Sequence, residues 1–160
     1  MSGTESFLHS FATSDVFKAF NLAMQEPAFL LVVLLFAGAA FFIVEKKRRP
    51  NVVVSLILTA IIVTVLKYLF AEARPCVGLS GCEADFGFPS GHAALAFSIA
   101  AHSFGTKYFY GFLLVALAIT LSRVIANVHS FPQVLAGAAI GFAISIVSGT
   151  ILNSVVKNGK

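Results

Sequence analysis

The chain has very little charge, and that shortage decides its class before any motif is considered. Only 11% of its 160 residues are charged, whereas a soluble domain carries about 25%. Hydrophobic residues make up 58% of the chain, and the mean hydropathy is +0.92. This composition excludes an ordinary soluble domain. It predicts a single membrane domain over residues 1–160, with no room for a separate soluble one.

Other features are missing as well. There is no basic tail and no alternation of basic and aromatic residues, which argues against binding to nucleic acid. Tryptophan, internal repeats and low-complexity segments are absent. The N-terminus lacks a basic stretch, and the first long apolar run starts near Pro27. We therefore expect no cleavable signal peptide, with the first membrane span serving as the signal.

Long apolar runs predict an all-α integral membrane protein, a bundle of about five transmembrane helices within residues 27–156. Ahead of the bundle, apolar residues recur every four positions in residues 4–26. This pattern is typical of an amphipathic helix, so we expect residues 1–26 to lie in the membrane interface. The expected spans are 27–44, 52–70, 89–104, 108–128 and a last one within 130–156.

The distribution of Lys and Arg predicts the orientation. Four consecutive basic residues at 46–49 follow the first span, and cytoplasmic loops carry such an excess. On this topology seven Lys and Arg residues fall inside, and four lie outside or at the outer ends of spans. Three of those four, Lys67, Arg74 and Arg123, need an explanation other than topology. We expect a multi-pass protein of the cell membrane with these three residues at its extracytoplasmic face.

Residues 88–92, with the sequence FPSGH, predict the start of an apolar helix that runs to about residue 104. Pro89 suits a first helical turn, Ser90 is a good cap, and Gly91 lets a ligand approach the backbone. The N–H groups of such a turn favour an anion, which His92 could also reach. The alternative is a proline-started helix with an incidental histidine.

The expected topology brings Lys67, Arg74, Arg123, His92 and His129 to one membrane face. Lys67 and Arg74 are seven residues apart, so they share a helix face if the helix continues toward residue 75. A single cation near a span end is often an anchor that reaches the interface. Three cations, two histidines and a helix N-terminus together indicate a site for a polyanion, with imidazoles for nucleophilic and acid–base work. Two histidines without adjacent carboxylates make a poor zinc set, so we expect no metal and no cofactor.

These residues resemble the three signature motifs of the type 2 phosphatidic acid phosphatase superfamily, which includes lipid phosphatases, undecaprenyl diphosphate phosphatases and the soluble vanadium haloperoxidases. The motifs occur in the family's order, as KxxxxxxRP at 67–75, PSGH at 89–92 and SRxxxxxH at 122–129. The resemblance implies that His129 is the nucleophile and that His92 is the general acid and base. It also implies a phosphate-binding set consisting of Lys67, Arg74, Ser90, Gly91 and Arg123.

One position departs from the family pattern. The third motif usually ends in Asp four residues after the nucleophilic histidine, and here that residue is Gln133. An amide oxygen can accept the imidazole N–H and select the tautomer of His129, but it supplies no charge. We expect Gln133 to keep an orienting role in an active enzyme with a shifted pH profile. The alternative is a catalytically weak relative that binds phosphate.

The resemblance implies a metal-independent phosphatase that hydrolyses a lipid phosphate or diphosphate at the outer membrane face through a phosphohistidine. By analogy with compact microbial members we prefer a polyprenyl diphosphate, such as undecaprenyl or dolichyl diphosphate. Phosphatidate and phosphatidylglycerophosphate remain alternatives. The membrane lipid and the bilayer are the expected partners, and the oligomeric state is not predicted. A transporter of phospholipid or anion is less compatible with ionisable residues gathered at one face.

The remaining polar residues receive simpler interpretations. Cys76 and Cys82 stand in an outer, oxidising loop, so we expect a disulfide, with two free thiols as the alternative. His102 is interpreted as structural, hydrogen-bonded between helices. The acidic residues of the same loop are interpreted as keeping it soluble rather than gating the site: Glu72, Glu83 and Asp85. Gly137 and Gly141 form a small-residue pattern for close helix packing, either within the bundle or between subunits.

Overall fold

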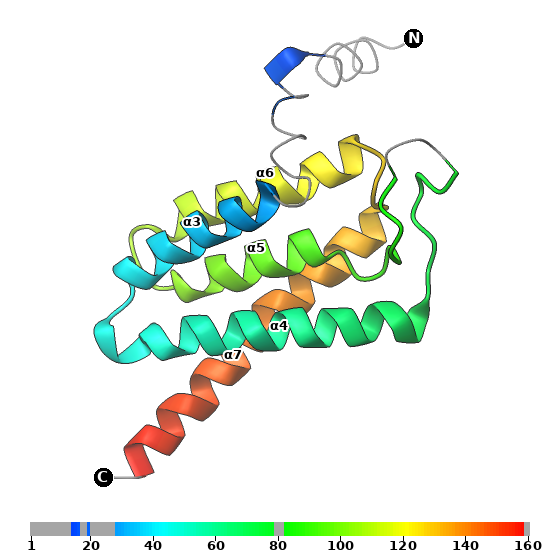
Figure 1. Cartoon of the computed structure of the whole chain (residues 1–160). Helices are drawn as coiled ribbons and strands as arrows, with labels where there is room; N and C mark the ends of the chain where they lie inside the picture. Colours follow the sequence, from blue (N-terminus) through cyan, green and yellow to red (C-terminus); the bar gives the residue numbers. More distant parts are fainter. Residues whose placement is uncertain (1–13, 17–18, 20–27, 79–81, 159–160) are drawn as a thin grey trace.

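The computed structural model describes residues 14–16, 19, 28–78 and 82–158, so most of the predicted interfacial segment lies outside the described residues. Helices account for all regular structure in this part of the chain. They follow the predicted order closely, and the all-α class is confirmed (Figure 1). The elements are α3 (Ala28–Ile43), the 3₁₀ turn η1 (Lys46–Arg48), α4 (Arg49–Phe70), α5 (Gly91–His102), α6 (Phe109–Ile125) and α7 (Phe131–Asn158).

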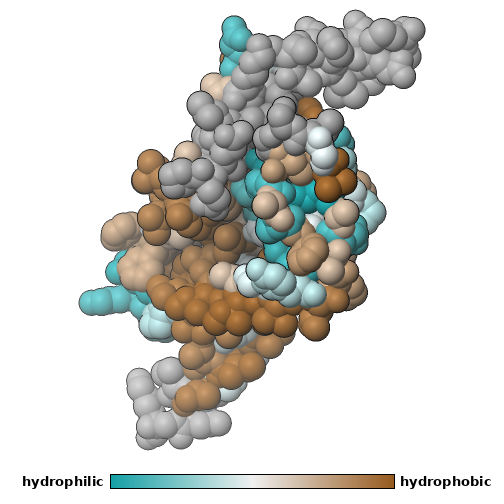
Figure 2. Space-filling model, turned by 45° about the vertical axis from the view of Figure 1, so that its right-hand side comes forward, coloured by the Kyte–Doolittle hydropathy of each residue, from teal (hydrophilic) through white to brown (hydrophobic). Residues whose placement is uncertain are grey.

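Two helical stretches among the described residues are long and apolar enough to cross a membrane, Lys46–Phe70 and Phe131–Val155. α3 and α6 are apolar but shorter, with 16 and 17 residues. Large apolar side chains point outward on several helices, among them Leu34, Ile61 and Leu114, each more than half exposed. Figure 2 shows apolar residues over much of the visible helical surface, with the largest group of hydrophilic residues at the upper right and a smaller group at the left edge. Such an apolar exterior suits lipid rather than water.

α5 is the central helix and contacts the other four (Figure 1). Its sequence is rich in alanine, and eight of its twelve residues are buried. α7 comes closest to it. A Cβ atom added to Gly137 would lie 2.3 Å from the Ser90 carbonyl oxygen, and one added to Gly141 would lie 1.9 Å from that of Ala94. Only glycine permits this approach, so the predicted small-residue pattern makes a contact within the bundle.

The end of α4 differs from the sequence prediction. The helix ends at Phe70, where Ala71 takes a left-handed conformation with φ of 48° and its N–H binds the Lys67 carbonyl oxygen. It therefore does not continue toward residue 75, and Arg74 lies on the following loop. Lys67 and Arg74 meet because the loop turns back over the bundle, not because they share a helix face.

The start of α5 also differs slightly. Pro89 precedes the helix rather than occupying its first turn, and α5 begins at Gly91. Ser90 is the N-cap, and its side chain accepts a bond from the Ala93 N–H at 3.5 Å. The backbone N–H of Ser90 donates to the Gln133 carbonyl oxygen at 3.0 Å. The beginnings of α5 and α7 are thus joined directly.

Candidate active site

A pocket of about 400 Å³ opens where α5 begins, between the ends of α3 and α4 and the loop that follows α4. Four residues of the predicted site line it: Lys67, Arg74, Gly91 and His92. The other lining residues are Phe29, Glu83, Ala84, Asp85 and Leu95. The pocket therefore combines two cations, a histidine and a helix N-terminus, as the sequence predicts, with two carboxylates.

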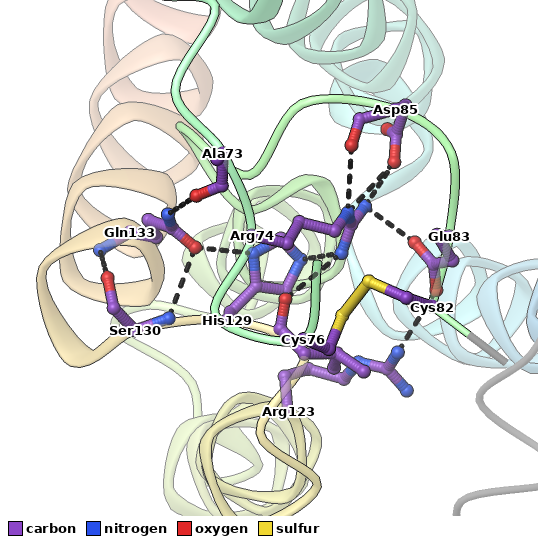
Figure 3. The surroundings of a disulfide bond; sticks show 11 residues. Ala73, Arg74, Cys76, Cys82, Glu83, Asp85, Arg123, His129, Ser130 and Gln133 are labelled. Carbon is purple, nitrogen blue, oxygen red and sulfur yellow. Dashed lines mark hydrogen bonds and ion pairs between the residues drawn. A yellow bond between two sulfur atoms is a disulfide. The ribbon is translucent and has the colours of Figure 1, made fainter. Parts of the chain in front are cut away.

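Arg74 connects this pocket to His129. Its guanidinium is buried, and Nη1 lies 2.9 Å from His129 Nε2 (Figure 3). Nη1 also lies 3.3 Å from the Val128 carbonyl oxygen. The same guanidinium reaches Glu83 Oε2 at 2.6 Å and binds the Asp85 carboxylate. An arginine can hold several acceptors at once because its five N–H donors lie in one plane. Arg74 thus contacts both carboxylates of the pocket and His129 at the same time.

Lys67 and Arg123 are linked to Arg74 through shared carboxylate partners. Lys67 donates to the Phe86 carbonyl oxygen at 2.6 Å and to Asp85, and Arg123 Nη2 donates to Glu83 Oε1 at 3.1 Å. Glu83 therefore bridges Arg74 and Arg123. Buried charges are costly unless they are paired, so these carboxylates balance the clustered cations. The interpretation of the two acidic residues as solubilising loop charges is wrong: they are ion-pair partners of the site.

The pKa of Asp85 reflects this pairing. Burial raises it, but hydrogen bonds from Lys67 and Arg74 outweigh burial and hold the pKa below its ordinary value. The cation cluster thus favours a negatively charged oxygen. A phosphate oxygen is the same kind of acceptor, and arginine binds either group through two parallel N–H donors.

His129 lies in the short connection between α6 and α7 and is 1% exposed. Its backbone N–H donates to the Arg123 carbonyl oxygen at 3.2 Å, which places the histidine beside the last turn of α6. Burial lowers the pKa of the imidazole to about 3, with the charge of Arg74 acting in the same direction. The ring is therefore neutral at physiological pH, as a nitrogen nucleophile must be.

Gln133 lies in the first turn of α7 and contacts the other side of the same ring. Its Oε1 lies 3.1 Å from His129 Nδ1 and also accepts the Ser130 backbone N–H at 3.1 Å. Its Nε2 donates to Glu72 Oε1 at 2.7 Å and to the Ala73 carbonyl oxygen at 3.1 Å. Sequence reasoning identified the contact with His129 from the four-residue spacing but missed Glu72.

The residues of the FPSGH segment at 88–92 have different positions in the site. His92 faces the pocket, and its ring lies against that of Phe29 with centroids 3.9 Å apart. Gly91 also lines the pocket, whereas Ser90 is fully buried and caps α5. The role of Phe29 carries no motif signal, because one phenylalanine among 17 cannot be singled out from the sequence.

Cys76 and Cys82 form a disulfide, with their Cα atoms 5.6 Å apart (Figure 3). Arg74 lies two residues before this bridge, and Glu83 directly follows it. The covalent link keeps the two ends of the loop together, and the Arg74–Glu83 ion pair joins the same two ends. Among the described residues no group of three or more His, Cys, Asp or Glu could hold a metal ion.

Comparison with known proteins places this geometry in a family. A model described as the PAP2 superfamily matches residues 51–156, which is 106 of the 160 residues. The chain belongs to the PAP2 superfamily. The matched region includes all the cations and both histidines of the site. No curated protein matches the sequence significantly.

Two crystal structures resemble the chain. LpxE from Aquifex aeolicus is 28% identical over 84% of this chain and 92% of its own, with a TM-score of 0.60. A transmembrane PAP2-type phosphatidylglycerolphosphate phosphatase from Bacillus subtilis is 18% identical over 97% of this chain and 89% of its own. The second, with a TM-score of 0.63, shows the shared fold. The PAP2 chain described here is thus a membrane-associated lipid phosphatase.

Proposed function

We propose that this PAP2 protein hydrolyses a membrane lipid phosphate or diphosphate without a metal, through a phosphohistidine at His129. The observation that carries the proposal is the position of Arg74, which reaches the anion-binding pocket and His129 Nε2 at once. A phosphate held by Arg74 would lie next to that nitrogen. Phosphoryl transfer depends mainly on positioning and charge stabilisation, which Lys67, Arg74 and Arg123 can supply in place of a metal.

The steps follow from the polar atoms. Incoming phosphate oxygens take over the N–H donors of Arg74, which frees the Nε2 lone pair. Nε2 of His129 attacks phosphorus, the bond to the leaving oxygen breaks, and His92 protonates that oxygen. Water, deprotonated by His92, then attacks the phosphohistidine. The P–N bond breaks, phosphate leaves, and His129 returns to its neutral state.

The surroundings of the pocket support a lipid substrate. A second cavity of about 320 Å³ runs between α4 and α5, and its walls include Ala60, Val63 and Leu95. Lys67 and Gly91 line both cavities. A phosphate in the polar pocket would therefore leave its apolar tail in this groove. Outward-facing apolar side chains on α4 would continue the path into the bilayer.

We prefer a polyprenyl diphosphate as substrate. Lys67 stands where the two cavities meet, so it would bind the phosphate nearer the tail, while Arg74 and Arg123 hold the terminal phosphate near His129. Phosphatidate and phosphatidylglycerophosphate, with a single terminal phosphate, are the competing substrates. The proposed topology has five spans and places the pocket at the extracytoplasmic face. It rests on the basic residues 46–49 at the opposite end of α4.

The test is phosphate release from each of the three lipids by purified protein in detergent containing EDTA. We expect release that survives EDTA, is fastest with the polyprenyl diphosphate, and disappears in His129→Ala. Faster turnover of either lipid with a single terminal phosphate would replace the substrate assignment. Release abolished by EDTA would contradict the metal-independent mechanism.

A further inference from the structure

The side chain of Gln133 is 1% exposed, and both ends of its amide are occupied. Oε1 faces the Ser130 N–H and His129 Nδ1, while Nε2 faces the Ala73 carbonyl oxygen and Glu72 Oε1. A backbone N–H can only donate and a carbonyl can only accept, so these two backbone groups determine which end is oxygen. The amide cannot be turned over without losing both bonds.

This orientation determines the proton on His129. Because Gln133 presents its oxygen, Nδ1 of His129 must donate, and Nε2 is left with its lone pair toward Arg74. On the far side the Gln133 amide donates to a carboxylate oxygen of Glu72 at 2.7 Å. One unbroken chain of hydrogen bonds therefore runs from His129 through Gln133 to Glu72.

We propose that Glu72 is a positioning residue that acts on His129 through the Gln133 amide. This inference rests on the proposed function, because it assigns Glu72 to the nucleophile of that reaction. The Glu72 carboxylate accepts a hydrogen bond from Gln133 Nε2, which polarises the amide and makes Gln133 Oε1 a stronger acceptor. Linked hydrogen bonds strengthen one another by roughly 10–30%. The Nδ1–H bond strengthens as the ring gains positive charge during attack on phosphorus.

The backbone holds Glu72 in place for this role. Its carbonyl oxygen accepts the Gly87 N–H at 2.7 Å, which ties the loop after α4 to the segment before α5. A Cβ on Gly87 would lie 2.6 Å from Gln133 Nε2, so glycine is needed for the amide to fit. The amide is thus enclosed by the same loop that presents the carboxylate to it.

Anion binding separates this role from a purely structural one. Vanadate would form a bond to the nucleophilic nitrogen of His129 and mimic five-coordinate phosphorus, whereas inorganic phosphate would only occupy the pocket. The charges around His129 are Lys67, Arg74 and Arg123 on one side and Glu72 on the other, with Glu83 and Asp85 between the cations. Loss of the Glu72 charge leaves the cations in place, so phosphate binding should be unchanged or tighter while vanadate binding weakens.

The experiment compares Glu72→Gln with wild type and with the matched control Glu45→Gln, an exposed glutamate before η1. For Glu72→Gln we expect kcat to fall about 10- to 100-fold. Losses of this size are typical when a residue that hydrogen-bonds to a metal ligand is removed, and Glu72 holds Gln133 in a comparable way. KM should change little. Calorimetry in detergent should give vanadate affinity about tenfold weaker, by the same argument, with phosphate affinity not reduced. Glu72→Asp should recover part of kcat, and Glu45→Gln should match wild type.

A second variant, Gln133→Asp, tests the role of Glu72 independently. Gln133→Asp puts a carboxylate four residues after His129, where it can act on the ring directly. In that background Glu72→Gln should cost less than about threefold in kcat, a loss of coupling that a double-mutant cycle measures. An equal loss in both backgrounds would overturn the relay and leave Glu72 as a loop residue.

The two proposals fail in different ways. If wild type releases no phosphate from any lipid, the proposed function fails, and the vanadate and phosphate affinities alone decide the relay. If wild type is active and Glu72→Gln keeps both its kcat and its vanadate affinity, the relay is overturned while the phosphatase stands.

Discussion

The two ends of the bundle each contain a buried or half-buried histidine among polar groups, yet only one end is built for chemistry. At one end His129 touches Arg74 and Gln133. At the other, His102 Nε2 lies 2.6 Å from Ser55 Oγ, which confirms the predicted hydrogen bond between helices. A cavity of about 180 Å³ adjoins His102, and Arg48 and Asn153 are among its lining residues.

The difference lies in where the partners come from. The partner of His102 lies on a neighbouring helix and carries no charge, which is enough to satisfy a polar group inside a bundle. His129 instead meets a cation from the loop after α4 and an amide that is itself bound to a carboxylate. His129 is therefore the candidate nucleophile, because charged side chains from separate segments surround it, whereas His102 is structural. Four predictions test this difference between the two histidines.

The largest contrast should come from removing each histidine. His129→Ala loses the nitrogen that would bond to phosphorus, so we expect lipid phosphate release to fall by about 10³-fold or more. His102→Ala loses one hydrogen bond between α4 and α5, which should lower the melting temperature while kcat stays within about twofold. Rates and thermal melts of both variants in the same detergent check this. Comparable activity losses in the two variants would remove the distinction.

Arginine geometry should give the next largest effect. Arg74→Lys keeps the charge but loses the planar set of donors that now reaches Glu83, Asp85 and His129 together. We expect kcat/KM to fall by about 10²- to 10³-fold, as for loss of a group that stabilises the transition state. Arg48→Lys, at the opposite end, should leave kcat/KM unchanged. Steady-state kinetics on the preferred lipid measure both.

Removing a carboxylate should act in the other direction on anion binding. Asp85 pairs with Lys67 and Arg74 and would compete with phosphate for them, so Asp85→Asn should tighten inhibition by inorganic phosphate by about three- to tenfold at low salt. Glu45→Gln removes an exposed charge that pairs with Lys47 and should have no effect. Inhibition constants at two salt concentrations test this, since screening should weaken the Asp85 effect. Weaker phosphate inhibition in Asp85→Asn would show that Asp85 does not compete with the anion.

The smallest effect should appear in stability against pH. The pKa of His129 is lowered to about 3, so between pH 6.5 and 3 the unfolded chain binds a proton that the folded site does not. Stability should therefore fall as pH decreases through this window. His129→Gln should flatten the fall by a few degrees in melting temperature. Melts from pH 7 to 4 provide the measurement, and parallel curves would contradict the buried neutral imidazole.

The fold was largely accessible from the sequence because lipid imposes a simple rule. Uncharged runs of sufficient length must be helices, and all five predicted segments are helical, with ends within about three residues of expectation. The misplaced ends have local causes. Ala71 adopts a left-handed conformation that no glycine signals, and Pro89 precedes the helix that it was expected to begin.

The site was accessible only where a motif carried it. Three spaced motifs predicted five site residues: Lys67, Arg74, His92, Arg123 and His129. In the structure three of them line one pocket, His129 contacts Arg74, and Arg123 is joined to Arg74 through Glu83. The acidic partners were misjudged because a loop sequence does not show which of its charges turn inward. The contact between Glu72 and Gln133 joins residues 61 positions apart, and no local spacing encodes it.

The contact of α7 with α5 has a consequence for how the chain tolerates variation. Gly137 and Gly141 meet backbone oxygens, whereas Cβ atoms at Gly38 and Gly111 would have nothing within 4 Å. In a saturation library selected for activity, the first pair should remain almost entirely glycine and the second pair should accept most apolar residues. Gly137 lies against Ser90, one turn beyond Gln133. Substitutions there should therefore reduce activity even though the residue does not contact substrate.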